Sequence, residues 1–176
     1  PVTSQAEPSK TPIQIFQKAE EYNALRQYSF ALDNYLSCLE LEPCHTDALN
    51  RVAEIFFRNG EYQKAMVYSH RALENDAYDT EANYLYGNIH QKLGNLIQAK
   101  EAFGWAGRSS EYRVSALIQL AQINFQESNY DQVKSQILQA LDYDASTIPA
   151  LQLLAALYRK TGQKKNALHI NSRILS

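Results

Sequence analysis

The sequence has 176 residues, of which 45% are apolar and 20% charged, and its formal net charge is −2. This composition is typical of a soluble globular chain with one domain or one repeat array. The 17 Lys and Arg residues form no basic cluster, and no stretch reaches the roughly 18–20 apolar residues of a membrane-spanning helix; we therefore expect neither nucleic-acid binding nor membrane insertion.

The chain begins with Pro1-Val2-Thr3-Ser4, which has no initiator Met and no apolar signal segment. We expect a fragment that lacks the native N-terminus and whose residues 1–11 form a flexible leader. The sequence does not define the cellular compartment. We expect a soluble protein, and the cytoplasm is the favoured compartment.

From residue 12 onward, small residues recur every 34 positions without an insertion. The first column contains Ala19, Ala53, Gly87, Ala121 and Ala155, the second Ala31, Ala65, Ala99, Val133 and Ala167, and the third Cys38, Ala72, Ala106, Ala140 and Ile174. Three columns in one register indicate an internal repeat. The predicted repeats cover residues 12–45, 46–79, 80–113, 114–147 and an incomplete fifth, 148–176.

Each repeat contains two stretches of helical periodicity with a short break between them. In the second repeat, Leu49, Val52 and Phe56 follow helical spacing, Asn59-Gly60 interrupts it, and Tyr62 resumes it. The corresponding breaks fall at Arg26, Gly60, Gly94, Ser128 and Gly162. The pattern predicts five helical hairpins.

Small residues at fixed positions permit close helix crossings, whereas larger side chains would separate the axes. Because one hairpin cannot bury its apolar faces alone, neighbouring hairpins must stack. The predicted fold is all-α, a right-handed superhelical solenoid with a concave and a convex side.

The third repeat departs from this pattern at Gly104-Trp105-Ala106-Gly107. Glycine inside a helix costs about 1 kcal/mol relative to alanine. We therefore predict that the second helix of this repeat is short or irregular near Gly107-Arg108-Ser109-Ser110. Trp105 either marks a second contact surface on the convex side or packs against this loosened repeat.

The period and the columns resemble the tetratricopeptide repeat over residues 12–176. An aromatic column of the family corresponds to Tyr22, Phe56, His90, Asn124 and Tyr158. The segment from Asp79 to Leu117 also resembles, more weakly, the C-terminal repeat region of large bacterial multidomain proteins with a sugar-mutarotase-like domain. The first resemblance implies a protein or peptide partner and no catalytic activity.

Residues that bear chemistry are scattered through the repeats. Cys38, Cys44 and His45 are the nearest approach to a metal site, but a closed zinc site needs four ligands; we expect Cys38 to be packed and Cys44 to be exposed in a loop. His90 in the aromatic column is expected to be a satisfied, half-buried ring. No phosphate-binding glycine loop or hydrolase motif is present, and we expect no catalytic residue, cofactor or metal.

In the tetratricopeptide family the first helix of each repeat lines the concave groove. Carried over by position, the resemblance assigns to the groove Asn50, Glu54, Phe57, Arg58, Tyr84, Asn88, Gln91, Ile118, Gln122, Phe125 and Gln152. The same offsets add Phe16, Glu20, Lys92, Gln126, Arg159 and Lys160. Amides in such a lining can satisfy the backbone of an extended peptide, and the aromatic rings can hold its apolar side chains.

Two functions remain open at this point. One is a protein–protein interaction module that holds an extended peptide in the groove; the other is a structural spacer or oligomerisation arm of a larger, carbohydrate-related protein. Leu168, Ile174 and Leu175 near the end of the fifth repeat favour self-association, because an uncapped terminal repeat leaves its apolar face open.

One binding mode of the family does not fit the sequence. Tetratricopeptide domains that bind the acidic C-terminus of chaperones present Lys, Asn and Arg at defined places. The matching places here hold Phe16 and Glu20, then Arg51, then Glu81 and Leu85. We therefore expect no binding of a free C-terminal carboxylate of that kind.

Overall fold

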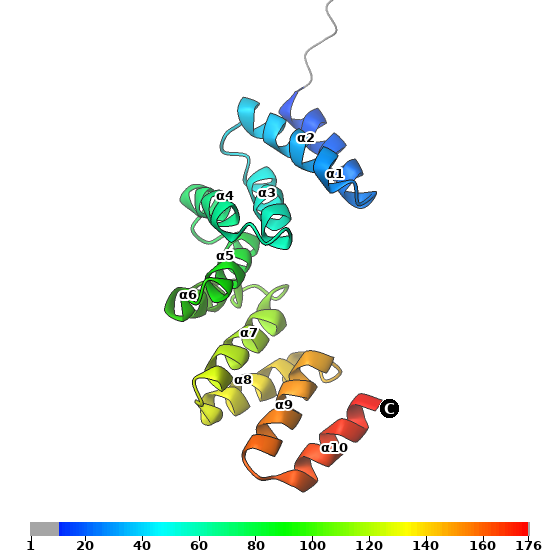
Figure 1. The fold of residues 1–176 in the computed structure, drawn as a ribbon, viewed down its shortest axis with the longest axis vertical. Coiled ribbons are helices and arrows are strands. Elements are labelled where there is room, and N and C mark those ends of the chain that lie inside the picture. The colour runs from blue at the N-terminus through cyan, green and yellow to red at the C-terminus, as the bar shows by residue number, and fades with distance from the viewer. Residues whose placement is uncertain (1–10, 176) are drawn as a thin grey trace, which may run out of the picture. The chain divides into compact units, whose positions relative to one another are not determined.

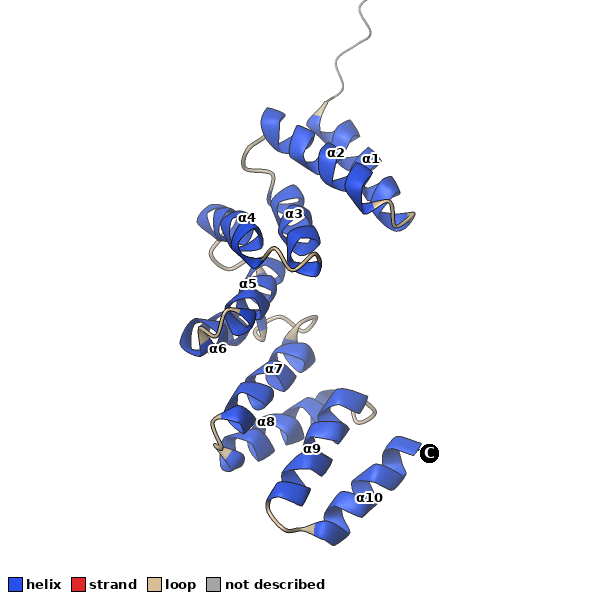
Figure 2. Cartoon of the chain, viewed as in Figure 1, coloured by secondary structure: helices blue, strands red, loops and turns tan. Residues whose placement is uncertain are grey.

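The computed structural model describes residues 11–175, which form ten α-helices and no β-strand (Figures 1 and 2). The helices are α1 (Pro12–Ala24), α2 (Tyr28–Leu41), α3 (Thr46–Arg58), α4 (Tyr62–Asn75), α5 (Thr80–Lys92), α6 (Leu96–Ala106), α7 (Arg113–Gln126), α8 (Tyr130–Tyr143), α9 (Ile148–Lys160) and α10 (Lys164–Leu175). The chain is all-α, and its consecutive helices form the repeated hairpins of a helical-repeat protein.

The predicted leader lies outside the described residues except for Thr11. Thr11 is the N-cap of α1, and its hydroxyl accepts a hydrogen bond from the Gln14 amide at 3.3 Å. The Gln14 side chain returns the contact by accepting from the Thr11 amide at 3.1 Å. This reciprocal capping box satisfies two amide groups that the helix cannot pair internally; Thr11 therefore belongs to the helix start and not to a leader.

A residue in the left-handed region stands between the two helices of every hairpin. Gly60, Gly94 and Gly162 have φ values of 78–80°, and the same role is filled by Arg26 at 59° and Ser128 at 63°. This conformation ends a helix and turns the chain, although it costs a non-glycine residue about 1–2 kcal/mol. The five breaks predicted from the sequence thus share one backbone conformation, which a residue other than glycine can also adopt.

The small-residue columns lie where the helices pack. All five members of the first and second columns are buried, and so are four members of the third; Ile174 is partly exposed. Gly87 shows why the column is restricted: a Cβ atom built there would lie 2.7 Å from the ring of Phe103 in α6, which is itself fully buried. The predicted link between small residues and helix contacts is confirmed.

The second helix of the third repeat is short, as predicted. Helix α6 has 11 residues, whereas α2, α4 and α8 have 14 each. It ends at Ala106 with Gly107 as its C-cap, and turns carry the chain to Arg113, where α7 begins.

The helices divide into two compact units, one with α1–α4 and the other with α5–α10. In the first unit, α2 packs against α3 between its two hairpins. In the second unit, α6 packs against α7 and α8 against α9, so its three hairpins share a continuous series of contacts. Two apolar clusters fill the second unit, one around Phe103 and Ile123 and the other around Ile137 and Leu154.

Candidate functional site

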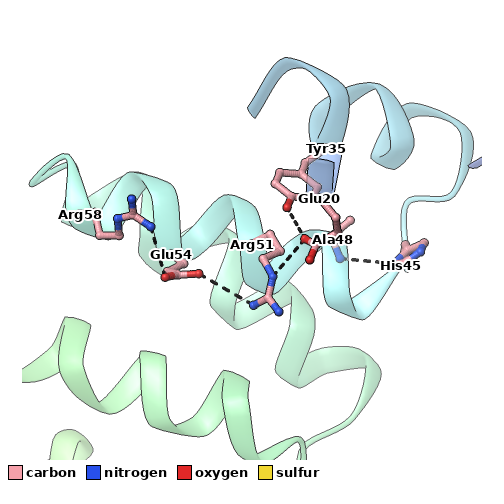
Figure 3. Close-up of polar contacts among 7 residues, drawn as sticks. All are labelled: Glu20, Tyr35, His45, Ala48, Arg51, Glu54 and Arg58. Carbon is pink, nitrogen blue, oxygen red and sulfur yellow. Dashed lines mark hydrogen bonds and ion pairs between the residues drawn. The ribbon is translucent and has the colours of Figure 1, made fainter. Parts of the chain in front are cut away.

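In the first unit, four charged side chains of alternating sign form a line across α1 and α3 (Figure 3). Arg51 lies between two acids, with its Nε 3.3 Å from Glu20 and its Nη1 3.8 Å from Glu54. Arg58 continues the line, with Nη1 3.5 Å from Glu54. The four side chains are 28–40% exposed, so they are held in place by one another and remain accessible to a partner.

Two aromatic residues of α2 support this line. Tyr35 is fully buried and donates its hydroxyl hydrogen bond to Glu20. Burial, together with the hydrogen bond to the Glu20 carboxylate, raises the pKa of the Tyr35 phenol, which therefore remains a donor at physiological pH. The guanidinium of Arg58 lies 4.0 Å from the ring centre of Tyr28, a cation–π contact. The line thus has fixed geometry and no net charge.

In the second unit, three of the predicted amides lie on α5 and α7. Asn88, Gln91 and Gln122 are half-buried, and their side chains make no hydrogen bond within residues 11–175. Asn88 and Gln122 are equivalent positions of consecutive repeats. Each side chain can both donate and accept, so this surface presents unused hydrogen-bonding capacity.

Gln152 lies farther along the same unit and is exposed. It lines a cavity of about 510 Å³ with Ala155 and Arg159 of α9 and Asn171, Ile174 and Leu175 of α10. Leu175 is 88% exposed and Leu168 69%. Of the three apolar residues expected to be open here, Leu168 and Leu175 are exposed and Ile174 is half-buried.

The predicted aromatic residues serve mainly in packing. The Tyr84 ring lies 5.6 Å from Phe103 and 5.2 Å from Tyr112, between ring centres. Phe57 contacts Tyr62 at 5.5 Å and Phe125 contacts Tyr130 at 5.9 Å. All three predicted rings are half-buried, so only part of each is left for a ligand.

Two of the predicted groove residues lie in the core. Asn50 is 1% exposed and Ile118 is 6% exposed. Helix α3 packs against both α2 and α4 and buries seven of its thirteen residues, which leaves only a narrow accessible arc for positions such as Glu54 and Arg58. Asn50 of α3 is therefore not accessible to a ligand.

Arg51 and Tyr35 were not part of the predicted surface. Arg51 could have been found from charge alternation, because Arg51, Glu54 and Arg58 follow the i, i+3, i+7 spacing of one helix face. Tyr35 has no such signal, since its role depends on the contact between α1 and α2.

The two cysteines and His90 differ in their exposure. Cys38 is buried and Cys44 exposed, as predicted. His90 is 7% exposed, more buried than predicted, and its Nε2 has no hydrogen-bond partner among the described residues. Burial lowers the pKa of His90. Within residues 11–175, no three His, Cys, Asp or Glu side chains gather in a way that could hold a metal ion, and no helix is long and apolar enough to cross a membrane.

Comparison with known proteins agrees with this architecture. Residues 80–104, which cover α5 and most of α6, match the family model of the tetratricopeptide repeat. The chain has the tetratricopeptide repeat fold. No curated protein matches the sequence.

Solved structures share this fold at low sequence identity. MamA from Desulfovibrio magneticus RS-1 is 14% identical, with a TM-score of 0.84 over 95% of this chain and 94% of its own. PilF from Pseudomonas aeruginosa is 18% identical, with a TM-score of 0.84 over 93% and 75%. YrrB, described as a TPR protein with an unusual peptide-binding site, is 19% identical, with a TM-score of 0.75 over 93% and 84%.

Within the tetratricopeptide frame, α1, α3, α5, α7 and α9 are the first helices of their repeats. The charged line of the first unit and the free amides of the second unit both lie on these first helices.

Proposed function

We propose that this chain is a non-catalytic protein–protein interaction module that binds an extended peptide segment along the first helices of its repeats. The observation that carries the proposal is the set of half-buried amides Asn88, Gln91 and Gln122, whose side chains have no hydrogen-bond partner within residues 11–175. Side-chain amides can pair with the N–H and C=O groups of an extended peptide without selecting its side chains.

The charged line supports the same function in the first unit. Because Glu20, Arg51, Glu54 and Arg58 neutralise one another, they offer hydrogen bonds without a net field. A peptide of mixed or neutral character suits such a surface better than a strongly acidic or basic one. The likeness in fold to YrrB, described as having an unusual peptide-binding site, adds support for a peptide partner.

Selection from a displayed library of random twelve-residue peptides tests the proposal. Peptides selected on the wild-type chain are synthesised with a fluorophore, and their affinities are measured by fluorescence polarisation. The double variant Asn88→Ala, Gln122→Ala is expected to bind them about tenfold more weakly, since each lost hydrogen bond contributes about 0.5–1.5 kcal/mol.

The matched control is Gln98→Ala, Gln132→Ala, in which exposed residues of the second helices α6 and α8 lose their amides. This control is expected to bind with wild-type affinity. Equal binding by both double variants, or a selection that yields no binding peptide, would contradict the proposal.

The exposed Leu168 and Leu175 favour a second candidate function, an oligomerisation arm. Leu175 also lines the cavity of α9 and α10, together with Ala155 and Ile174 and with three polar residues, Gln152, Arg159 and Asn171. Exposed apolar side chains of this kind can mediate association. In this alternative the chain associates with copies of itself through α9 and α10.

A further inference from the structure

The short α6 leaves a cavity of about 240 Å³ between α6, α7 and α8. Tyr143 at the end of α8 is one of the residues that line the cavity. Within residues 11–175, four second helices are followed by another hairpin, and α6 is the shortest of them, with 11 residues against 14 in α2, α4 and α8. The cavity is therefore a local feature of this chain and not a consequence of the repeat.

The inner walls of the cavity are mainly apolar, with Gln139 and Tyr143 of α8 as the uncharged polar residues that also line it. Leu117 and Leu120 of α7 contribute apolar side chains, and Gly104 of α6 contributes none. A Cβ atom built on Gly104 would meet no atom within 4 Å. The glycine therefore leaves open the space that any other residue would begin to fill.

Two arginines stand at the rim. Arg113 donates from Nε to the Gly107 carbonyl at 3.3 Å and from Nη2 to the Arg108 carbonyl at 3.1 Å, so its guanidinium is fixed over the end of α6. The Arg108 guanidinium lies 3.8 Å from the ring centre of Trp105.

Neither guanidinium has a carboxylate partner in the described part of the chain, and none of the residues that line the cavity is acidic. Arg113 keeps its Nη1 amine free of protein hydrogen bonds within residues 11–175. The rim therefore offers two oriented, uncompensated positive charges to an incoming ligand.

The size of the cavity favours a side chain over a small-molecule ligand. Pockets for cofactors and small molecules usually have volumes of about 300–1,000 Å³, which exceeds the volume found here. A single large apolar side chain, fixed by charge-assisted hydrogen bonds at the rim, is the usual anchor of a protein interface.

We propose that this cavity is a second peptide-docking site, which takes one aromatic side chain of a partner segment with a carboxylate side chain next to it. The aromatic ring enters between Leu117, Leu120 and Gly104. The adjacent carboxylate accepts hydrogen bonds from Arg113 and Arg108.

This site is separate from the surface formed by the amides. Leu117 and Leu120 lie about 140–160° around α7 from Gln122, at the 3.6 residues per turn of an α-helix. The two surfaces can therefore be blocked independently, and a failure of one proposal leaves the other standing.

The test uses the acetylated and amidated peptide Ala-Ala-Asp-Phe-Asp-Ala-Ala, whose blocked C-terminus leaves the Asp side chains as its carboxylates. Binding is followed by the fluorescence of Trp105, the single tryptophan, and by the ¹H–¹⁵N shifts of Gly104 and Gly107. We expect saturable binding with shifts at both glycines. Replacing Phe by Ala, or both Asp by Lys, is expected to weaken binding by about tenfold, the loss typical of a removed anchor.

Gly104→Leu fills the cavity from its own wall, and Gly104→Ala is the matched control. We expect Gly104→Leu to fold and to lose binding by about tenfold or more, because the anchor is excluded. Gly104→Ala adds one methyl group and improves helix propensity, so it is expected to bind within about twofold of wild type and to melt at a higher temperature.

Several results would overturn the site. They are the absence of saturable binding, equal affinity for the Asp and Lys peptides, and undiminished binding by a folded Gly104→Leu variant. Peptides selected for the amide surface should bind Gly104→Leu as they bind wild type, and loss of that binding would also count against two separate sites.

Discussion

His90 occupies a position where the repeat prefers an aromatic ring, and a polar atom is buried as a result. The Nδ1 atom of His90 lies 3.3 Å from the side-chain amide nitrogen Nδ2 of Asn95. The Tyr86 ring contacts the imidazole ring edge-on, with 4.3 Å between the ring centres. The Nε2 atom has no partner among the described residues. A buried polar atom without a hydrogen bond costs about 1–3 kcal/mol, so this histidine destabilises the repeat that contains it.

His90→Phe is expected to increase stability, and more so at acidic pH. Unfolded, His90 takes up a proton near its ordinary pKa of 6.5, whereas burial lowers its pKa in the folded chain. The unfolded state therefore binds more protons as the pH falls below about 6.5, and the wild type loses stability there. Urea unfolding at pH 7.5 and 5.5 should show a larger difference between wild type and variant at pH 5.5.

The control for this measurement is Gln98→Phe, which adds the same ring at an exposed position of α6 and removes no titratable group. This variant should keep the pH dependence of stability of wild type. An unchanged pH dependence in His90→Phe would show that His90 protonates equally in both states.

The burial of individual residues was harder to predict than their periodic position. Asn88 and Gln122, which the family resemblance assigns to the groove, are half-buried residues of α5 and α7. The 34-residue period does not show that Asn50 is in the core, because the burial of one position depends on contacts between helices. The packing of Tyr84 against Tyr112 was equally hidden, since Tyr112 lies in the irregular segment after α6.

Contacts between elements decide the roles of the two adjacent acids of α1. Glu20 accepts from the buried Tyr35 hydroxyl of α2 and from Arg51 of α3 (Figure 3). Glu21 has only a local contact with Lys18, at 3.0 Å, and 65% of its side chain is exposed. Glu20 therefore joins three helices, whereas Glu21 belongs to one.

Glu20→Ala is expected to destabilise the first unit by about 1–3 kcal/mol, because it leaves the buried Tyr35 hydroxyl without its acceptor. Glu21→Ala, the matched control, is expected to cost less than about 0.5 kcal/mol, as exposed ion pairs contribute little. Chemical unfolding of both variants provides the measurement.

Tyr35→Phe in the Glu20→Ala background removes the stranded hydroxyl. This second change should restore part of the lost stability. One contrary result is that Glu20→Ala and Glu21→Ala lower the free energy of unfolding equally, and another is that Tyr35→Phe lowers it further. Either result would show that the unpaired Tyr35 hydroxyl does not cause the destabilisation by Glu20→Ala.

The elements themselves were largely predictable. Glycine content forecast the short α6, and the breaks in periodicity forecast the five hairpin turns. The ion pair between Glu20 and Arg51 was not forecast, because the two residues are 31 positions apart and their contact depends on the angle between α1 and α3.

At the scale of the whole molecule, each helix packs mainly against its neighbours along the chain. In a repeat protein built in this way, the free energy of unfolding is approximately a sum of two kinds of contribution. One is the intrinsic stability of each repeat, and the other is the interaction between adjacent repeats. This is why one period, read in three columns, was sufficient to predict the all-α repeat fold, although it carries no information on the partner.

The exposed apolar residues of α9 and α10 lead to a prediction for the assembly. Sedimentation velocity over a range of concentrations should show association of the wild-type chain. Leu168→Glu, Leu175→Glu should remain monomeric, because charged side chains resist burial in an apolar contact.

The control is Val67→Glu, which alters an exposed apolar residue of α4 in the other unit. This variant should associate as wild type does. A wild-type chain that remains monomeric at the highest concentration would exclude the oligomerisation arm.

The alternating charges of Glu20, Arg51, Glu54 and Arg58 have a consequence for ionic strength. Dissolved salt weakens the long-range attraction between a net-charged surface and a charged ligand. These four side chains have no net charge, so they exert little long-range attraction that salt could weaken. Peptide binding to these side chains should therefore change little between low and high salt. The uncompensated Arg108 and Arg113 differ in this respect, since added salt weakens their attraction for a carboxylate. A salt titration of two labelled peptides thus distinguishes the two surfaces without any mutation.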